Sequence, residues 1–262
     1  MFPILFFIGP LGIRTAGVVV IVAIWMGAWL AARRLRQRGL SEGLAYDFIL
    51  PALLSGLVVA RFYYALAFDP AWYLERPTEL LWVWKGGFAE EGGFFGAVAA
   101  AVWWCRRRDV QFLMFADAMA PAVALGQALA RVGALLGGTG YGTPTTLPWS
   151  IVFSDPNAAA PLGIPLHLTQ VYEAMAGLLL AALLLFVERW TRRGQLFLIL
   201  LIGLALQRSA FDLIRGDAIW ITEWATSGQV AGTVVFLGAL VFILRRRHGE
   251  ALGGAAWREP LM

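Results

Sequence analysis

Seven apolar stretches of membrane-spanning length follow one another along the chain. They cover residues 14–33, 44–67, 88–105, 113–137, 168–188, 194–214 and 226–244. A helix needs about 20 apolar residues to cross the hydrocarbon core of a bilayer. Because no water in that core can satisfy a free backbone, such stretches fold as helices. The sequence therefore predicts an all-α integral membrane protein with about seven transmembrane helices.

Composition agrees with this interpretation and excludes a nucleic-acid partner. The chain is 60% hydrophobic and 15% charged, whereas soluble domains have about 45–50% apolar and about 25% charged residues. Its basic pI of about 9.6 comes from short arginine clusters at the ends of apolar stretches, a pattern typical of topology control. We expect residues 1–262 to form one polytopic domain.

The arginine clusters also predict the orientation in the membrane. They follow the first, third, fifth and seventh stretches: Arg33, Arg34, Arg36 and Arg38; Arg106, Arg107 and Arg108; Arg189, Arg192 and Arg193; Arg245, Arg246 and Arg247. The positive-inside rule assigns such clusters to the cytoplasm. The N-terminus is then outside and the C-terminus cytoplasmic. The first stretch lacks a basic segment before it, so we expect a retained helix and not a cleaved signal.

Two of the connections that this orientation places outside have distinct compositions. Residues 68–87 contain Trp72, Tyr73, Trp82 and Trp84, aromatic residues of the kind that favour the headgroup region. This segment is predicted to be an interfacial arm. Residues 138–166, rich in Gly, Thr and Pro, are predicted to be an external loop or cap.

Ionisable side chains inside the stretches are the strongest functional signal, since each is costly in lipid unless it is paired or hydrated. All but one of the main examples fall in the outer half of the bilayer: Arg61, Glu90, Glu91, Arg131, Glu173, Arg208 and Asp212. One interpretation is structural ion pairs, such as Arg61 with Glu173 or Arg208 with Asp212. The other is a cavity whose arginines bind the phosphate of a phospholipid. Asp117 lies in the inner half and is expected to pair or to cap a helix.

Cysteine and histidine offer little further chemistry. Cys105 is the one cysteine, so no disulfide forms within the chain, and we interpret it as a small apolar filler. His167 and His248 are far apart and lack metal-ligand spacing. We expect neither a metal nor another cofactor.

Residues 131–142, RVGALLGGTGYG, followed by Thr143, Pro144 and the Leu-Pro-Trp at 147–149, resemble the signature of the prolipoprotein diacylglyceryl transferase family. Further segments agree with that family in order and spacing: Phe7–Arg14 (FIGPLGIR), Ala60–Tyr64 (ARFYY), Val83–Ala97 (VWKGGFAEEGGFFGA), Ile164–Glu173 (IPLHLTQVYE) and Arg208–Asp217 (RSAFDLIRGD). The resemblance spans nearly the whole chain.

The resemblance implies an enzyme of the bacterial inner membrane. It would move the diacylglyceryl group of phosphatidylglycerol to a lipobox cysteine thiol in a prolipoprotein signal peptide, or to another acceptor, and release glycerol phosphate. Arg131 and Arg208 match the two essential arginines of the family. The resemblance further implies these substrate-binding positions: Arg61, Gly133, Gly142, His167, Gln170, Tyr172, Glu173, Asp212 and Arg215.

Several family positions are substituted in this chain. Glu91 stands where the family has a histidine, and Ala134, Thr139 and Ala16 replace an asparagine, an acid and an aromatic residue. Glu91 is the candidate for the missing base, and with Arg131 and Arg208 it forms the predicted catalytic set.

Three functions remain open at this point. The first is a diacylglyceryl transferase, or a paralogue that uses another acceptor. The second is a non-catalytic lipid-binding relative, since the histidine is absent. The third is a transporter, which needs a polar path across the membrane, and the inner half offers little beyond Asp47 and Asp117.

Overall fold

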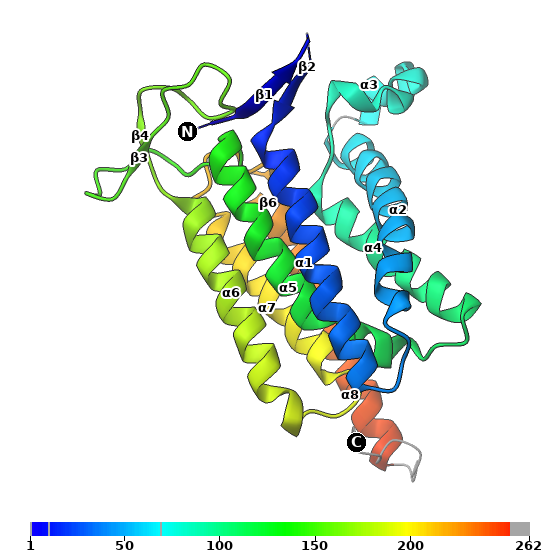
Figure 1. Ribbon diagram of the computed structural model, residues 1–262. Helices are drawn as coiled ribbons and strands as arrows, with labels where there is room; N and C mark the ends of the chain where they lie inside the picture. Colours follow the sequence, from blue (N-terminus) through cyan, green and yellow to red (C-terminus); the bar gives the residue numbers. More distant parts are fainter. Residues whose placement is uncertain (1, 10, 69, 252–262) are drawn as a thin grey trace.

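The computed structural model describes residues 2–9, 11–68 and 70–251, and it is a bundle of long helices (Figure 1). The long helices are α1 (Thr15–Gln37), α2 (Gly43–Phe68), α4 (Glu90–Arg107), α5 (Phe112–Gly137), α6 (Thr169–Val187), α7 (Gln195–Phe211) and α8 (Ser227–Ala251). Each of them corresponds to one apolar stretch, so the stretches were a sound guide to the helices.

Within the described ranges, four helical segments are long and apolar enough to cross a membrane: α1, α2, α5 and the continuous segment Thr169–Trp190. Helix α7 and the apolar part of α8, Ser227–Val241, are shorter. Helix α4 has 18 residues, begins with two glutamates and ends with two arginines. The fold is therefore that of a helical membrane protein.

The connections contain short elements that hydropathy did not predict. Strands β1 (Ile4–Ile8) and β2 (Leu11–Arg14) form a hairpin before α1, and β3 (Ile151–Val152) pairs with β4 (Pro165–Leu166). Strands β5 (Trp220–Thr222) and β6 (Ala225–Thr226) pair before α8. The expectation of an all-α fold omitted these three antiparallel pairs, because a strand of two to five residues carries almost no periodic signal.

The segment between α2 and α4 is also folded. It contains α3 (Pro70–Glu75) and the 3₁₀ helices η1 (Pro77–Leu81) and η2 (Val83–Lys85). Together with the β1–β2 hairpin and the β3–β4 loop, α3 lies at one end of the bundle, and the C-terminal turns of α8 lie at the other (Figure 1).

Glycines allow α2 and α4 to approach closely. A methyl group on Gly96 would lie 2.5 Å from the backbone oxygen of Ser55, and one on Gly92 would lie 2.6 Å from Cβ of Tyr63. The Ser55 hydroxyl donates a 2.8 Å hydrogen bond to the backbone oxygen of Gly96. Small residues at these positions thus permit the close packing of the two helices.

The end of the bundle opposite α3 is held by ion pairs and a helix cap. Arg34 and Arg38 at the end of α1 both contact Glu188, which begins the 3₁₀ helix η3 (Glu188–Trp190) after α6. Asp117 of α5 accepts the backbone N–H groups of Gly194 and Phe197 at the start of α7. Asp117 is therefore a capping residue, as expected, and belongs to no site at the other end.

Candidate active site

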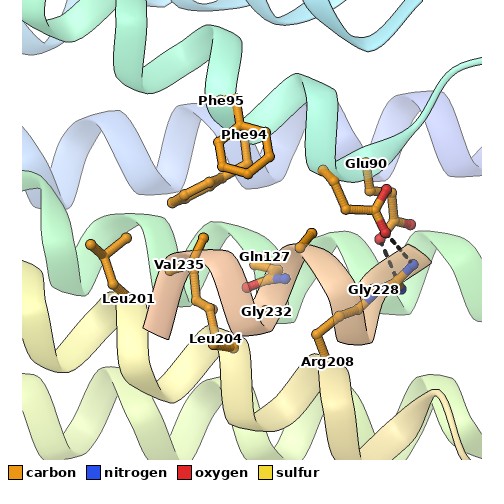
Figure 2. A pocket seen from close by; sticks show the side chains of 13 residues that line it. Glu90, Phe94, Phe95, Gln127, Leu201, Leu204, Arg208, Gly228, Gly232 and Val235 are labelled. Carbon is orange, nitrogen blue, oxygen red and sulfur yellow. Dashed lines mark hydrogen bonds and ion pairs between the residues drawn. The ribbon is translucent and has the colours of Figure 1, made fainter. Parts of the chain in front are cut away.

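A cavity of about 110 Å³ lies among α4, α5, α7 and α8 and has two unlike ends. Figure 2 shows Phe94, Phe95, Leu201 and Val235 at one end and the carboxylate of Glu90 beside the guanidinium of Arg208 at the other. Such a cavity suits a molecule with an apolar part and a charged part.

Arg131, in the second half of α5, pairs with Glu90, whose carboxylate lines the charged end. Its Nη1 and Nη2 donate to the two carboxylate oxygens of Glu90 at 3.2 and 2.9 Å, so the ion pair is bidentate. Its Nε lies 2.6 Å from Oε2 of Glu173 in α6. Arg131 thus joins α4, α5 and α6 while its side chain is 10% exposed.

Arg208, near the end of α7, contacts three carboxylates. Its Nη2 lies 3.0 Å from Oε1 of Glu91, its Nη1 lies 3.4 Å from Oε2 of Glu90, and its Nε lies 3.4 Å from Oδ1 of Asp212. The ion pair expected between Arg208 and Asp212 is confirmed. A methyl group on Gly228 of α8 would collide with both Arg208 and Asp212, so a residue without a side chain is required there.

Two hydroxyl groups next to the start of α8 donate hydrogen bonds to Glu91 and Asp212. The Ser227 hydroxyl donates to Oε1 of Glu91 at 3.3 Å, and the Thr226 hydroxyl donates to Oδ2 of Asp212 at 2.6 Å. Glu91 is therefore fixed from two sides, by α7 and by α8.

Arg215, which follows α7, is the third arginine of this site. Arg131, Arg208, Arg215 and the carboxylates that they contact form one cluster of charges. Its Nε donates to Oδ1 of Asp217 at 2.9 Å, and its Nη1 lies 3.8 Å from Oε1 of Glu173 and 4.0 Å from Oε2 of Glu90. Burial acts to lower the pKa of Arg215, but the carboxylates of Glu90 and Asp217 outweigh it and hold the pKa above its ordinary value. Arg215 therefore stays cationic.

The segment that follows α5 packs against this cluster and contacts it through backbone groups. The N–H of Gly140 donates to Oδ2 of Asp217 at 2.8 Å, and the Thr169 hydroxyl donates to the oxygen of Gly140 at 2.6 Å. Gln170 donates to the oxygen of Thr139 at 3.0 Å. Gly142 is paired with Arg215 in a β-bridge, and a methyl group on it would lie 2.5 Å from Cβ of His167.

Arg61 was expected among the buried ion pairs, and the structure corrects this. Its guanidinium donates to backbone oxygens of the 79–87 segment, including those of Glu79, Gly86 and Gly87. Glu173 pairs with Arg131 and Arg215 instead. The chain between α2 and α4 folds back over the end of α2. The Arg61 guanidinium is therefore bound by backbone carbonyl groups of that segment instead of by the carboxylate of Glu173.

The structure brings most of the predicted site residues together. Glu91, Arg131, Glu173, Arg208, Asp212 and Arg215 form one connected cluster, with Gln170, Gly142 and His167 in the segment that wraps it.

Besides Arg61, two predicted residues lie elsewhere. Gly133 faces α1, where a methyl group would lie 3.1 Å from the oxygen of Ala16. The hydroxyl of Tyr172 accepts a hydrogen bond from Nε1 of Trp149 at 2.7 Å.

The predicted site residues did not include Glu90, Asp217 or Ser227, although Glu90 was among the ionisable residues placed in the outer half of the bilayer. Glu90 contacts all three arginines of the cluster. Its position next to Glu91 at the start of an apolar stretch was the available signal. Asp217 and Ser227 lie outside or at the edge of the apolar stretches, where hydropathy carries no information about partners.

A helical membrane bundle with an amphipathic cavity, whose charged end holds Arg208 and the Glu90 carboxylate that three arginines share, suits a membrane protein for an amphiphile bearing an anionic group. Comparison with known proteins gives the particular family. The family model described as prolipoprotein diacylglyceryl transferase matches residues 3–245. The chain belongs to this family of membrane enzymes.

Individual relatives agree with the family model. Phosphatidylglycerol–prolipoprotein diacylglyceryl transferases from Bacillus velezensis, Geobacillus kaustophilus and Paracidovorax citrulli are 32%, 34% and 34% identical to this chain. The aligned regions cover 95%, 93% and 94% of this chain and 94%, 92% and 96% of the relatives. The resemblance seen in the sequence is confirmed over nearly its whole length.

Proposed function

We propose that this protein moves the diacylglyceryl group of phosphatidylglycerol to the cysteine thiol of a prolipoprotein signal peptide in the bacterial inner membrane. The named relatives carry this activity in their names. The observation that carries the proposal is the convergence of Arg131 and Arg208 on one carboxylate at the charged end of the cavity.

The reaction needs stabilisation of a leaving phosphate. The thiolate attacks a glyceryl carbon, the new S–C bond forms as the C–O bond to phosphate breaks, and glycerol phosphate leaves with the electron pair. Guanidinium groups that face the leaving oxygens in a water-poor cavity stabilise the developing charge. Arg131 and Arg208, with Arg215 beside them, have this role.

A base must take the proton of the thiol, because a cysteine with a pKa of about 8.5 is only a few per cent thiolate at neutral pH. Glu91 stands at the family's histidine position and lines the cavity. Its carboxylate has fixed partners in Arg208 and Ser227. We assign the base role to Glu91.

Two substrates need two places, and a second cavity supports this. It has a volume of about 450 Å³, lies among α1, α2, α4 and α5, and shares Phe94, Gln127 and Leu204 with the first cavity. An apolar signal peptide and a diacylglycerol unit would then meet beside these shared residues.

The proposed topology has seven spans, an outer N-terminus and a cytoplasmic C-terminus. The ends of α1 and α6 that carry Arg34, Arg38 and Glu188 would face the cytoplasm, and the arginine cluster would face the outer leaflet. Residues 68–87 are proposed as the interfacial arm, because Leu74, Leu81 and Trp84 are highly exposed there. Residues 138–166 are proposed as the external cap.

The test is direct transfer by the purified, full-length protein. It is incubated with phosphatidylglycerol labelled in its acyl chains and with a synthetic lipobox peptide, and the mass of the peptide is measured. Gain of a diacylglyceryl group on the cysteine supports the proposal, and a Cys→Ser peptide is the control. If the lipid binds but the mass of the peptide does not change, the protein binds lipid and does not carry out the transfer.

A further inference from the structure

Glu90 differs from the other carboxylates of the arginine cluster. Its side chain is 55% exposed, whereas those of Glu91, Glu173 and Asp212 are 8%, 9% and 1% exposed. The other three are fixed by neighbouring helices or hydroxyl groups. Glu90 is the first residue of α4, and the contacts described for its carboxylate are all with guanidinium groups.

One oxygen of Glu90 lies among the three arginines. Its Oε2 is 2.9 Å from Nη2 of Arg131, 3.4 Å from Nη1 of Arg208 and 4.0 Å from Nη1 of Arg215. Three guanidinium groups around a single oxygen is the arrangement expected for a bound phosphate oxygen.

The carboxylate satisfies these arginines only in part. Among the described residues, Nη1 of Arg215 is buried and has no hydrogen-bond partner, and Nη1 of Arg208 is at the long end of hydrogen-bond distance. An unpaired buried donor lowers stability, because it has lost its hydrogen bonds to water without a replacement. A phosphate has more oxygen atoms than a carboxylate and can serve all three arginines together.

The charges favour replacement of the Glu90 carboxylate by the lipid phosphate over simultaneous binding of both anions. A carboxylate and the phosphodiester of phosphatidylglycerol each carry one negative charge, so replacing one by the other leaves the charge beside the arginines unchanged. Both together would place like charges a few ångströms apart beside the buried side chains of Arg131 and Arg215, which is unfavourable. The exposed side of Glu90 gives it a route out through rotation of its side-chain bonds.

We propose that the carboxylate of Glu90 occupies the place of the donor lipid's phosphate and leaves when the lipid binds, so that Glu90 sets the affinity of the site for anionic headgroups. This inference rests on the proposed function for the identity of the donor lipid. It assigns to Glu90 a role that differs from that of Glu91, which stays in place beside Arg208.

The proposal is tested with Glu90→Gln, which keeps the size of the side chain and removes its charge. Binding to the purified full-length protein is measured for phosphatidylglycerol, for diacylglycerol and for glycerol phosphate. Glu90→Gln should bind phosphatidylglycerol at least about tenfold more tightly than the unmodified protein. Diacylglycerol, which lacks the phosphate, should bind equally to both proteins. Glycerol phosphate distinguishes the headgroup from the acyl chains, and its affinity should also rise.

Two further variants keep the result interpretable. Glu42→Gln removes an exposed carboxylate that pairs with Arg36 far from the cluster, and it should leave all three affinities unchanged. Glu90→Asp keeps the charge but shortens the side chain, and should give an intermediate affinity for phosphatidylglycerol. It also replaces Glu90→Gln if that variant fails to fold.

The outcomes separate this inference from the proposed function. Unchanged or weaker binding of phosphatidylglycerol by Glu90→Gln would overturn the inference and make Glu90 a structural partner of Arg131, even if transfer by the unmodified protein is normal. Tighter binding by Glu90→Gln without any transfer by the unmodified protein would support the inference and reject the transferase function.

Discussion

Glu91 and Arg208 form a 3.0 Å ion pair that joins the first turn of α4 to the last turns of α7. This pair places the family's substituted histidine position directly against one of its two arginines. The cavity beside the pair is lined by both residues. In the proposed mechanism, this pair sets the base next to a cation that binds the phosphate, as transfer between a thiol and a phospholipid requires.

The first prediction concerns Glu91→Gln. The amide oxygen of the glutamine can still accept from Arg208 and Ser227, but it cannot take a proton. Because general acid–base help is typically worth about 10²–10⁴-fold, transfer should fall by a factor in that range while phosphatidylglycerol still binds. The measurement is the rate of peptide modification beside a lipid-binding assay. Full activity in Glu91→Gln would remove Glu91 from the mechanism and make His167 the next candidate.

The second prediction concerns Arg131→Ala. Arg131 donates to Glu90 and Glu173, and in the proposed mechanism it faces the phosphate. Its loss should weaken both lipid binding and transfer, since electrostatic stabilisation by one such donor is worth roughly 10²–10³-fold in rate. Arg131→Lys keeps the positive charge but cannot form the bidentate interaction, so it should retain only part of the rate. An unchanged affinity for phosphatidylglycerol in Arg131→Ala would contradict the phosphate-binding role.

The third prediction concerns stability. Glu173→Ala removes a buried carboxylate that pairs with Arg131 and Arg215, and breaking a buried pair costs roughly 3–5 kcal/mol. The unfolding midpoint of the purified protein should drop by many degrees. Glu42→Ala, which breaks the exposed pair with Arg36, should change the free energy of unfolding by less than about 1 kcal/mol. Equal midpoints for the two variants would show that the cluster adds no stability.

The fourth prediction uses two neighbouring glycines of α4. A methyl group on Gly96 would lie 2.5 Å from the backbone oxygen of Ser55, whereas one on Gly93 has its nearest neighbours at 3.9 Å. Gly96→Ala should therefore push α2 from α4 and destabilise the protein by about 1–3 kcal/mol. Gly93→Ala should be tolerated. Thermal unfolding of both variants measures this, and a tolerated Gly96→Ala would contradict the described contact between the helices.

The sequence predicted the helices well, because seven long apolar stretches leave little choice of structure in a membrane. It also placed Arg131 and Arg208 at the same depth of the membrane, and in the structure both contact the carboxylate of Glu90. It did not predict the partners of Arg61, since these depend on how the segment after α2 folds back. It placed Glu90 at the depth of the cluster but gave it no role in the site, because depth alone does not show that its carboxylate is shared by three arginines.

The fifth prediction tests the proposed topology, which the clusters of arginines support. A reporter fused after Arg247 should give a cytoplasmic signal, and one inserted at Asn157 in the 138–166 segment should give an external signal. A third insertion after Gly39, in the short connection between α1 and α2, should match the reporter after Arg247, because Arg34, Arg36 and Arg38 precede it. A reporter of protein level is needed at each site, since an insertion that prevents folding also lowers the signal. Reversed signals at all three sites would move the arginine cluster to the cytoplasmic leaflet, where it could not meet a signal peptide from the outer side.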